Sequence, residues 1–196
     1  MTKLLYQKHG SYRITSNDGR IIYVDPYAGK GYDAPADLIL VTHQHRDHNQ
    51  ISRCAQKPNC RIITNNEAIV DGNHNSFDVD GILIQAVWAE NRRHDPKQCV
   101  GYIITLDDIK VYASGDTSKT KQMESFAELR LDYALFPGDG LFNMGLKEAA
   151  ECAKLIGAKH NILIHLKPSE SVLKKAQAWD APNKVIIEPG QEIELV

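Results

Sequence analysis

One short stretch constrains the fold and the chemistry of this chain more than any other, the run LILVTHQHRDHNQ at residues 38–50. Its first part is too apolar for a half-exposed strand and predicts a strand that is buried on both faces. The second part holds four side chains that can all bind a metal ion: His43, His45, Asp47 and His48. Residues two apart in an extended segment point to the same side, so His43 and His45 can reach one ion. Asp47 and His48 are neighbours, so the backbone must turn, as at a strand-to-helix junction, before both can serve a second ion.

The ligand types narrow the choice of metal. Imidazole and carboxylate groups suit zinc, manganese or iron rather than copper(I) or calcium. A polar loop with chance histidines is the alternative, but nothing in folding requires four potential ligands at the end of a buried strand. A rigid strand end also fixes metal geometry better than a free loop does. We therefore predict a metal site at the end of this strand.

The remaining pattern predicts a mixed α/β protein. Apolar and alternating runs predict strands at residues 4–7, 11–16, 20–26, 37–43, 61–64, 81–90, 100–106, 109–116, 133–139, 161–166 and 184–196. Helical spacing predicts helices at residues 49–58, 120–129, 146–158 and from about 169 to 179. Strands cluster in each half of the chain and helices follow them, which favours two sheets packed back to back with helices outside. The length of 196 residues suits one domain, residues 1–196.

Charge, cysteine content and hydropathy limit the partners and the location expected for this chain. The net charge of -2 gives no basic excess, so a nucleic-acid partner is disfavoured. The four cysteines are scattered without a CxxC pair, which is typical of reduced thiols. The N-terminus lacks the apolar segment of a signal peptide, and no stretch has the length of a membrane span. We therefore expect a cytoplasmic protein without a membrane partner, and leave open whether it forms a homo-oligomer.

The motif from Thr42 to His48 resembles the T-H-x-H-x-D-H signature of the metallo-β-lactamase superfamily. The resemblance implies an α/β fold, the αββα four-layer sandwich of the metallo-β-lactamase type. It also implies three more ligands in the order His, Asp, His. The Asp stands in a G-D-T sequence at a strand end, which Asp116 matches, and the last His ends a late strand, which His165 matches. The middle His is His94, with His74 as the competing candidate, whereas His160 is predicted to be a surface residue.

The resemblance assigns these residues to two sites. His43, His45 and His94 form the first site, and Asp116 bridges both ions. The second site is completed by Asp47, His48 and His165. Two divalent ions are implied, with zinc as the first choice and manganese or iron as alternatives.

Two further stretches are similar to the small lactonase-like and phosphodiesterase-like members of this superfamily. The first, residues 9–29, holds the His9-Gly10-Ser11 turn and the Asp25-Pro26 pair, and the second, residues 136–165, holds a Met144-Gly145 turn that opens a helix. Asp25 is predicted to accept a hydrogen bond that orients a ligand histidine or its loop. For His9, a packed histidine without contact to the site is the alternative to a role beneath the metals.

Two adjacent ions can share a hydroxide that is ionised near neutral pH and attacks a carbonyl carbon or a phosphorus. This predicts a hydrolase that uses a dinuclear metal-bound hydroxide to cleave an ester, lactone or phosphodiester bond, with Asp47 as the proton acceptor or relay. A metal-holding sensor or binding protein without turnover, or a small nuclease, are the alternatives.

Cations accompany three of the ligand-bearing segments. Arg46 lies between two predicted ligands, Arg93 precedes His94, and Lys167 follows His165 by two residues. Arginine offers a fork that matches carboxylate and phosphate oxygens. These residues predict a small anionic substrate, and the alternative is that they are solvated charges or partners of nearby acids.

Overall fold

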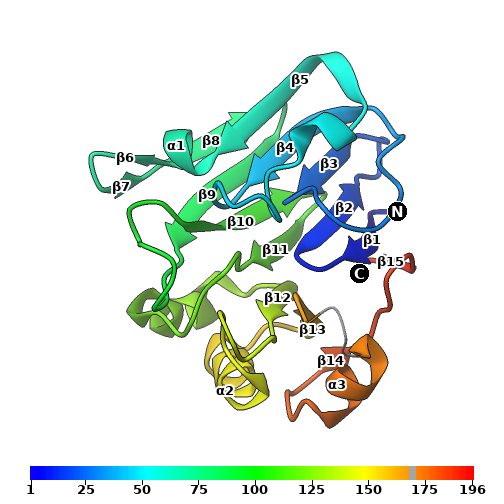
Figure 1. Cartoon of the computed structure of the whole chain (residues 1–196). Coiled ribbons are helices and arrows are strands. Elements are labelled where there is room, and N and C mark those ends of the chain that lie inside the picture. Colours follow the sequence, from blue (N-terminus) through cyan, green and yellow to red (C-terminus); the bar gives the residue numbers. More distant parts are fainter. Residues whose placement is uncertain (168–170) are drawn as a thin grey trace.

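Two mixed β-sheets pack face to face in this protein, and the computed structural model describes them over residues 1–167 and 171–196 (Figure 1). The first sheet contains β1 (Lys3–Lys8), β2 (Ser11–Thr15), β3 (Ile21–Val24), β4 (Ala36–Val41), β5 (Gln56–Thr64) and β15 (Glu192–Glu194), in the order β15-β1-β2-β3-β4-β5. The second contains β8 (Ser76–Val79), β9 (Ile82–Trp88), β10 (Val100–Leu106), β11 (Ile109–Ala113), β12 (Tyr133–Pro137), β13 (His160–Ile164) and β14 (Lys184–Val185), in the order β14-β13-β12-β11-β10-β9-β8. A small hairpin of β6 (Ile69–Val70) and β7 (Asn73–His74) follows the four-residue helix α1 (Asn65–Ala68).

The main core lies between the two sheets. Alternation along each strand sends every second side chain inward, so both sheets contribute to it. Its fully buried members include Leu4, Ile14, Ile22, Leu38, Ile84, Tyr102, Ile104, Leu135 and Ile162. Each aliphatic side chain of this kind contributes about 1.5–3 kcal/mol by leaving water. The core therefore holds the two sheets rigidly beneath the loops at their edge.

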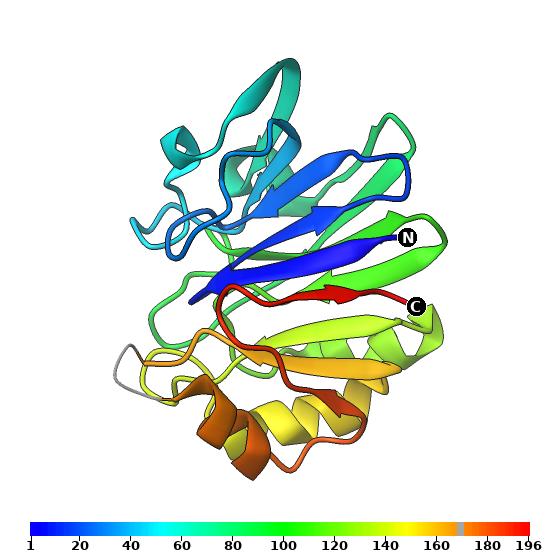
Figure 2. The ribbon, with the colours of Figure 1, turned by 90° about the vertical axis from the view of Figure 1, so that its right-hand side faces the viewer.

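The outer layers of the two sheets differ. The second sheet is covered by η2 (Lys121–Leu129), α2 (Leu146–Ile156) and α3 (Val172–Ala178), which pack on it through Met123, Phe126, Ala153, Ile156 and Trp179 (Figure 2). The first sheet is covered by the loop before β4 and by η1 (Ile51–Arg53), a single turn of 3₁₀ helix, through a cluster with Tyr23, Tyr32 and Ile39. Over the described residues, no helix is both long and apolar enough to cross a membrane.

The helix predicted at residues 49–58 is wrong. Only Ile51–Arg53 are helical, because Gln56 already pairs with Ala36 as β5 begins its parallel course beside β4. The long-range pairing leaves room for one helical turn. The helix predicted from about residue 169 is found as α3, with Ser171 as its N-cap, and Ser169 lies outside the described residues.

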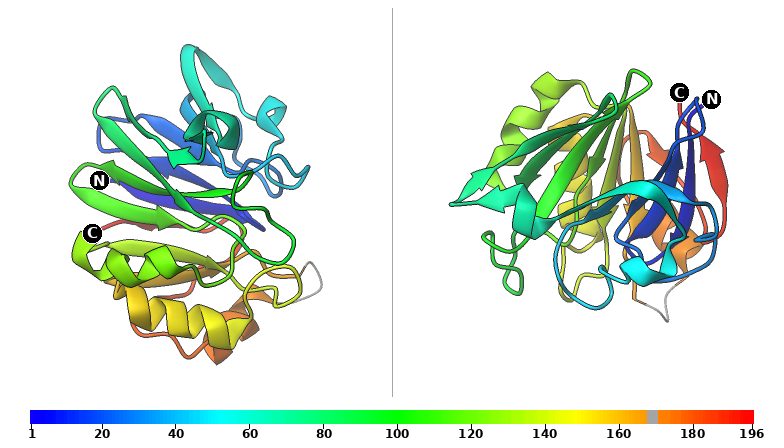
Figure 3. Two further views of the ribbon diagram at one scale, coloured as in Figure 1. Left: turned by 90° about the vertical axis from the view of Figure 1, so that its left-hand side faces the viewer. Right: turned by 90° about the horizontal axis from the view of Figure 1, so that it is seen from above.

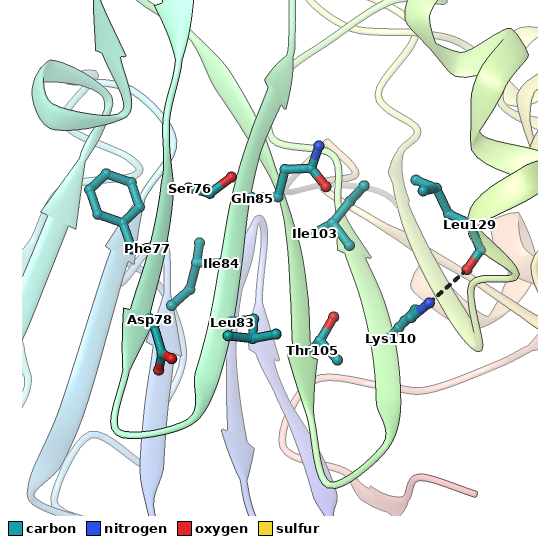
Figure 4. A pocket seen from close by; sticks show the side chains of 10 residues that line it. All are labelled: Ser76, Phe77, Asp78, Leu83, Ile84, Gln85, Ile103, Thr105, Lys110 and Leu129. Atoms are coloured by element: carbon teal, nitrogen blue, oxygen red, sulfur yellow. Dashed lines mark hydrogen bonds between the residues drawn. The ribbon is translucent and has the colours of Figure 1, made fainter.

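The loops that follow β4, β9 and β12 gather at one edge of the sandwich, opposite the edge that carries both termini (Figures 2 and 3). A groove of about 510 Å³ lies elsewhere, on the outer face of β8, β9 and β10 beside the end of η2 (Figure 4). Phe77, Leu83 and Leu129 line it, and Lys110 Nζ donates a hydrogen bond to the Leu129 carbonyl at 3.1 Å. It shares no lining residue with the loop edge described next.

Candidate metal centre

Strand ends carry most of the predicted ligands to one place. β11, β12 and β13 run parallel, so their carboxyl ends meet at the same edge of the second sheet. Asp116 follows β11 and His165 directly follows β13, while His43 follows β4 of the first sheet. Residues 45–48 form a tight turn in which the His48 amide donates to the His45 carbonyl at 3.0 Å. This turn lets the neighbouring Asp47 and His48 face the centre together.

His43, His45 and His94 form the first group of candidate ligands, each offering a ring nitrogen within 4.8 Å of the others. The His94 Nε2 and His45 Nδ1 atoms are 3.2 Å apart. His74 lies elsewhere, at the end of β7 with its ring 6.4 Å from that of Trp88. The structure therefore brings His94, and not His74, to His43 and His45.

The second group of candidate ligands consists of His9, Asp47, His48 and His165, again with ligand atoms within 4.8 Å of one another. His48 Nε2 lies 3.2 Å from His165 Nε2. His9 Nε2 donates to Asp47 Oδ2 at 3.2 Å, and its ring lies 3.7 Å from the His165 ring, centroid to centroid. His9 therefore touches the centre directly. His160 stacks on Tyr133 at 4.7 Å, at the start of β13, away from both groups.

Asp116 lies between the two groups. Its Oδ2 is 3.4 Å from His94 Nε2, and its Oδ1 is 3.2 Å from His165 Nε2 and 3.4 Å from His48 Nε2. Gly115 makes this position reachable, because it has a φ of 63° and an added Cβ would lie 2.8 Å from the Val100 carbonyl oxygen. One carboxylate thus presents one oxygen to each group.

Asp25 and Thr42 orient one histidine of each group, and we call Asp25, Thr42, His43 and His48 the strand-end network. Asp25 Oδ1 accepts from the Thr42 amide at 2.7 Å, and its Oδ2 accepts from the Thr42 hydroxyl at 2.7 Å and from His48 Nδ1 at 2.8 Å. The Thr42 oxygen in turn accepts from His43 Nδ1 at 3.0 Å. All four residues are buried.

A second set of contacts, the loop network, consists of Asn91, His94, Asp139, Asn143 and His165. Asn91 Oδ1 accepts from His94 Nδ1 at 2.8 Å, and its Nδ2 donates to Asn143 Oδ1 at 2.9 Å. Asn143 Nδ2 then donates to Asp139 Oδ2 at 2.8 Å, which lies 3.2 Å from His165 Nδ1. Sequence analysis missed Asn91, Asp139 and Asn143. Asp139 had one detectable signal, since it follows a predicted strand whose neighbour ends on His165.

The proton positions test whether these residues fit a cation. In a neutral imidazole one nitrogen carries the proton and the other holds a lone pair. Nδ1 of His43, His48 and His94 faces an oxygen acceptor within 3.0 Å, so in the neutral ring each Nε2 presents its lone pair. His165 Nδ1 lies 3.2 Å from an Asp139 carboxylate oxygen, which favours the same tautomer. His43 Nε2 is buried without a hydrogen-bond partner among the described residues. Converging lone pairs repel one another unless a cation lies between them, so the donor set fits metal ions.

The electrostatics agree with this arrangement. Burial opposes a charge on His48, but the carboxylates of Asp116 and Asp25 outweigh it and raise the pKa of His48 to about 9, so near neutral pH a proton takes the place of a metal ion at its Nε2. Burial and the neighbouring His48 lower the pKa of His43 to about 2. Burial also opposes ionisation of Asp116, but the surrounding histidines lower its pKa to about 2. The hydrogen bond from His9 holds the pKa of Asp47 far below its usual range. The centre therefore attracts positive charge.

Left-handed backbone conformations occur at three residues of the centre. His9, Asp25 and His165 have φ values of 60°, 46° and 50°. Such conformations cost of order 1–3 kcal/mol each in non-glycine residues and persist where the surrounding structure holds them. Tyr6 donates its hydroxyl to the His9 carbonyl at 3.0 Å, and the His165 amide donates to the same oxygen at 2.8 Å.

The predicted cations have different surroundings. Arg46 is exposed in the turn between His45 and Asp47. Arg93 lies over the Phe142 ring at 5.1 Å and lines the pocket of about 300 Å³ beside the first group. Lys167 is half-buried two residues beyond His165.

Comparison with known proteins identifies the family. The family described as the beta-lactamase superfamily domain matches residues 3–165. This chain belongs to that superfamily. A UPF0173 metal-dependent hydrolase of Thermococcus onnurineus is 30% identical over 226 aligned positions, covering 100% of both chains. A relative with the same name from Methanospirillum hungatei is 31% identical and covers 98% of this chain and 99% of its own.

A solved structure has the same fold as this chain. Igni18, a metallo hydrolase from Ignicoccus hospitalis, superimposes with a TM-score of 0.76 at 21% identity, covering 98% of this chain and 97% of its own. At this identity the likeness shows the fold alone. The predicted α/β sandwich and membership of the metallo-β-lactamase superfamily are confirmed, and the chain is a metal-dependent hydrolase.

Proposed function

We propose that this hydrolase holds two divalent metal ions, zinc as the first choice, and cleaves an ester, lactone or phosphodiester bond in a small anionic molecule. One observation carries the proposal: Asp116 presents one carboxylate oxygen to each of two adjacent groups of histidines. That arrangement is what two ions sharing a bridging carboxylate require.

The ligand assignment follows from the two groups. His43, His45 and His94 would hold one ion, and Asp47, His48 and His165 would hold the other, with Asp116 between them. When bound, two divalent ions supply a water nucleophile that is ionised near neutral pH and polarise the bond to be cleaved. His9 contributes a further nitrogen beside the second group.

The chain's own residues handle the proton and the geometry. Asp47 is the proposed proton acceptor, because its carboxylate is ionised and its side chain is 42% exposed toward solvent. His9 Nε2, which donates to Asp47 Oδ2 at 3.2 Å, keeps this carboxylate ionised and ready to accept that proton. The strand-end and loop networks keep each Nε2 directed at the centre. Arg93, at the pocket beside the first group, is a proposed substrate contact, as are Arg46 and Lys167.

Metal stoichiometry and turnover, measured on one sample, test the proposal. We expect about two ions per chain and metal-dependent turnover of at least one substrate in an ester, lactone and phosphodiester panel. Asp116→Ala should lower the metal content of both sites, whereas His94→Ala should keep about one ion per chain. Each should lower turnover by at least about 100-fold, since ligand loss exceeds the cost of losing an orienting partner.

His74→Ala is the matched control, because it removes a histidine that lies outside both groups. It should keep metal content and turnover close to wild type. Full metal content and activity in Asp116→Ala would refute the bridging role. Tight metal binding without turnover on any substrate of the panel would refute the proposed ester, lactone and phosphodiester specificity.

A further inference from the structure

A pocket of about 570 Å³ opens on the His9 side of the centre. His9 and Asp47 of the second group line it, together with Lys8, Tyr27, Arg53, Ala28 and Gly29. A molecule that reaches the second group from this side therefore passes these side chains. Lys8 and Arg53 come from the end of β1 and from η1, two segments that sequence analysis did not connect with the substrate.

The charge of this pocket differs from that of the pockets beside Arg93. Of the described residues that line it, two are cationic, Lys8 and Arg53, and Asp47 alone is acidic. Asp47 already belongs to the candidate centre. Beside the first group, Arg93 shares its pocket with Asp95, and the neighbouring pocket pairs Arg92 and Arg93 with Glu148. Two cations face one acid both here and in the pocket of Arg92 and Arg93. On the His9 side that acid is Asp47, whose charge a metal ion would offset, and this favours an anion there.

The wall that carries Arg53 is held in place by packing. The Arg53 guanidinium lies 5.1 Å over the Tyr32 ring, and the Tyr32 hydroxyl donates to the Ala28 carbonyl at 2.7 Å. Gly29 has a φ of 81°, and an added Cβ would lie 2.0 Å from the Gln7 carbonyl oxygen, so this loop sits directly on the backbone of β1. A preformed wall lowers the entropy lost when a ligand is bound.

We propose that Lys8 and Arg53 bind a carboxylate or phosphate group of the substrate that is remote from the bond that is cleaved. The exposed Tyr27 ring would flank the part of the substrate between this anionic group and that bond. This rests on the proposed hydrolase function and names the part of the site that selects an anion. Arginine offers a planar fork for carboxylate or phosphate oxygens, and lysine adds a point charge. Tyr27 is 37% exposed and its ring lies 5.6 Å from that of His9, edge to face.

A matched pair of esters tests the proposal. The para-nitrophenyl esters of butyrate and of succinate share the leaving group and the chain length, and only the second carries a remote carboxylate. In the metal-loaded wild-type protein, kcat/KM should be higher for the succinate ester. Lys8→Gln and Arg53→Gln should each lower the succinate-to-butyrate ratio about tenfold, the usual effect of losing one charged hydrogen bond.

Lys30→Gln is the control, because it removes an exposed charge on the same loop without touching the pocket. Its ratio should equal that of wild type. Arg53→Lys keeps the charge but not the fork and should give an intermediate ratio. A wild-type ratio near one, or a ratio that neither Gln variant changes, would overturn the proposal.

Binding of the matching anilides separates this proposal from the hydrolase function. By calorimetry, para-nitrosuccinanilic acid should bind the metal-loaded protein more tightly than para-nitrobutyranilide, and the double variant Lys8→Gln/Arg53→Gln should lose the difference. Equal binding of the two anilides to wild type refutes the anion site whatever the turnover. Selective binding without metal-dependent hydrolysis of either ester supports the anion site and counts against the proposed function.

Discussion

The strand-end network and the loop network each orient one histidine of each candidate metal group, yet they are built from different parts of the fold. Asp25 and Thr42 lie at the ends of β3 and β4, and the Asp25 amide donates to the Leu40 carbonyl at 2.9 Å, which ties the network to the first sheet. Asn91 and Asn143 lie in loops, and the two residues before Asn143 are open to solvent: Leu141 is 62% exposed and Phe142 45%.

The two networks therefore differ in how firmly the fold fixes the ligand histidines. His43 and His48 are oriented by a buried carboxylate that the sheet itself fixes. His94 and His165 are oriented by side chains on loops that also form the mouth of the centre. Loops are where a scaffold changes its ligand without changing its core. We therefore expect substitutions in the strand-end network to damage both metal groups, and substitutions in the loop network to damage one.

Asp25→Asn should have the largest effect. An amide nitrogen in place of Oδ2 would face both the His48 Nδ1 proton and the Thr42 hydroxyl, so His48 and His43 would lose their fixed tautomers. In place of Oδ1 it would face the Thr42 amide and loosen Thr42, which orients His43. Zinc affinity of both groups should fall about 100-fold, the upper range for an orienting partner. Competition with a chromophoric chelator measures this. The metal-free variant should also unfold more easily by about 1–3 kcal/mol, because a buried donor is left unsatisfied.

Asp33→Asn is the matched control for that variant, because it makes the same change at an exposed aspartate of the first sheet's outer loop. It should leave zinc affinity and stability at the wild-type values. An Asp25→Asn protein that loses zinc from one group alone would remove the distinction between the two networks.

Asp139→Asn should have a smaller and more selective effect. Oδ1 of Asp139 accepts from the amides of Leu141 and Phe142, at 2.6 and 2.7 Å, and the asparagine oxygen can keep these bonds. The contacts of Oδ2 with His165 Nδ1 and with Asn143 Nδ2 are lost, whereas Asn143 Oδ1 still accepts from Asn91 Nδ2 beside the first group. Zinc affinity of the second group should fall about tenfold while that of the first stays unchanged. Stepwise zinc titration resolves the two groups, and an equal loss from both would show that the loop network acts as one rigid unit.

Asn91→Ala should have the smallest effect. Asn91 is half-buried, so water can replace its oxygen as the acceptor for His94 Nδ1. Zinc affinity of the first group should fall by no more than about tenfold. A larger loss than that of Asp139→Asn would place the more important half of the loop network at His94.

The two networks also differ in how far their residues could be predicted from the sequence. Buried strands ending on potential ligands are local patterns. His43 was predicted from such a pattern alone, and Asp116 and His165 were predicted from the family resemblance, which such strand ends matched. Asn91 and Asn143 carry no such signal, because asparagine is common in every turn. The helix expected at residues 49–58 failed because a strand pairing between Ala36 and Gln56 overrode local spacing. The pocket of Lys8 and Arg53 joins chain positions that no local pattern connects.

The contact between His48 and His165 also bears on how the chain folds. These residues are 117 positions apart in the chain and come from different sheets. An ion held by both would close a loop of that length, as a covalent cross-link does, and restrict the unfolded chain by an amount on the order of 4–5 kcal/mol in the loop-entropy description. Neither half of the chain holds a complete second group by itself. Metal capture is therefore expected late in folding, after the sheets have docked, and chelators are expected to speed global unfolding by releasing the two halves from each other.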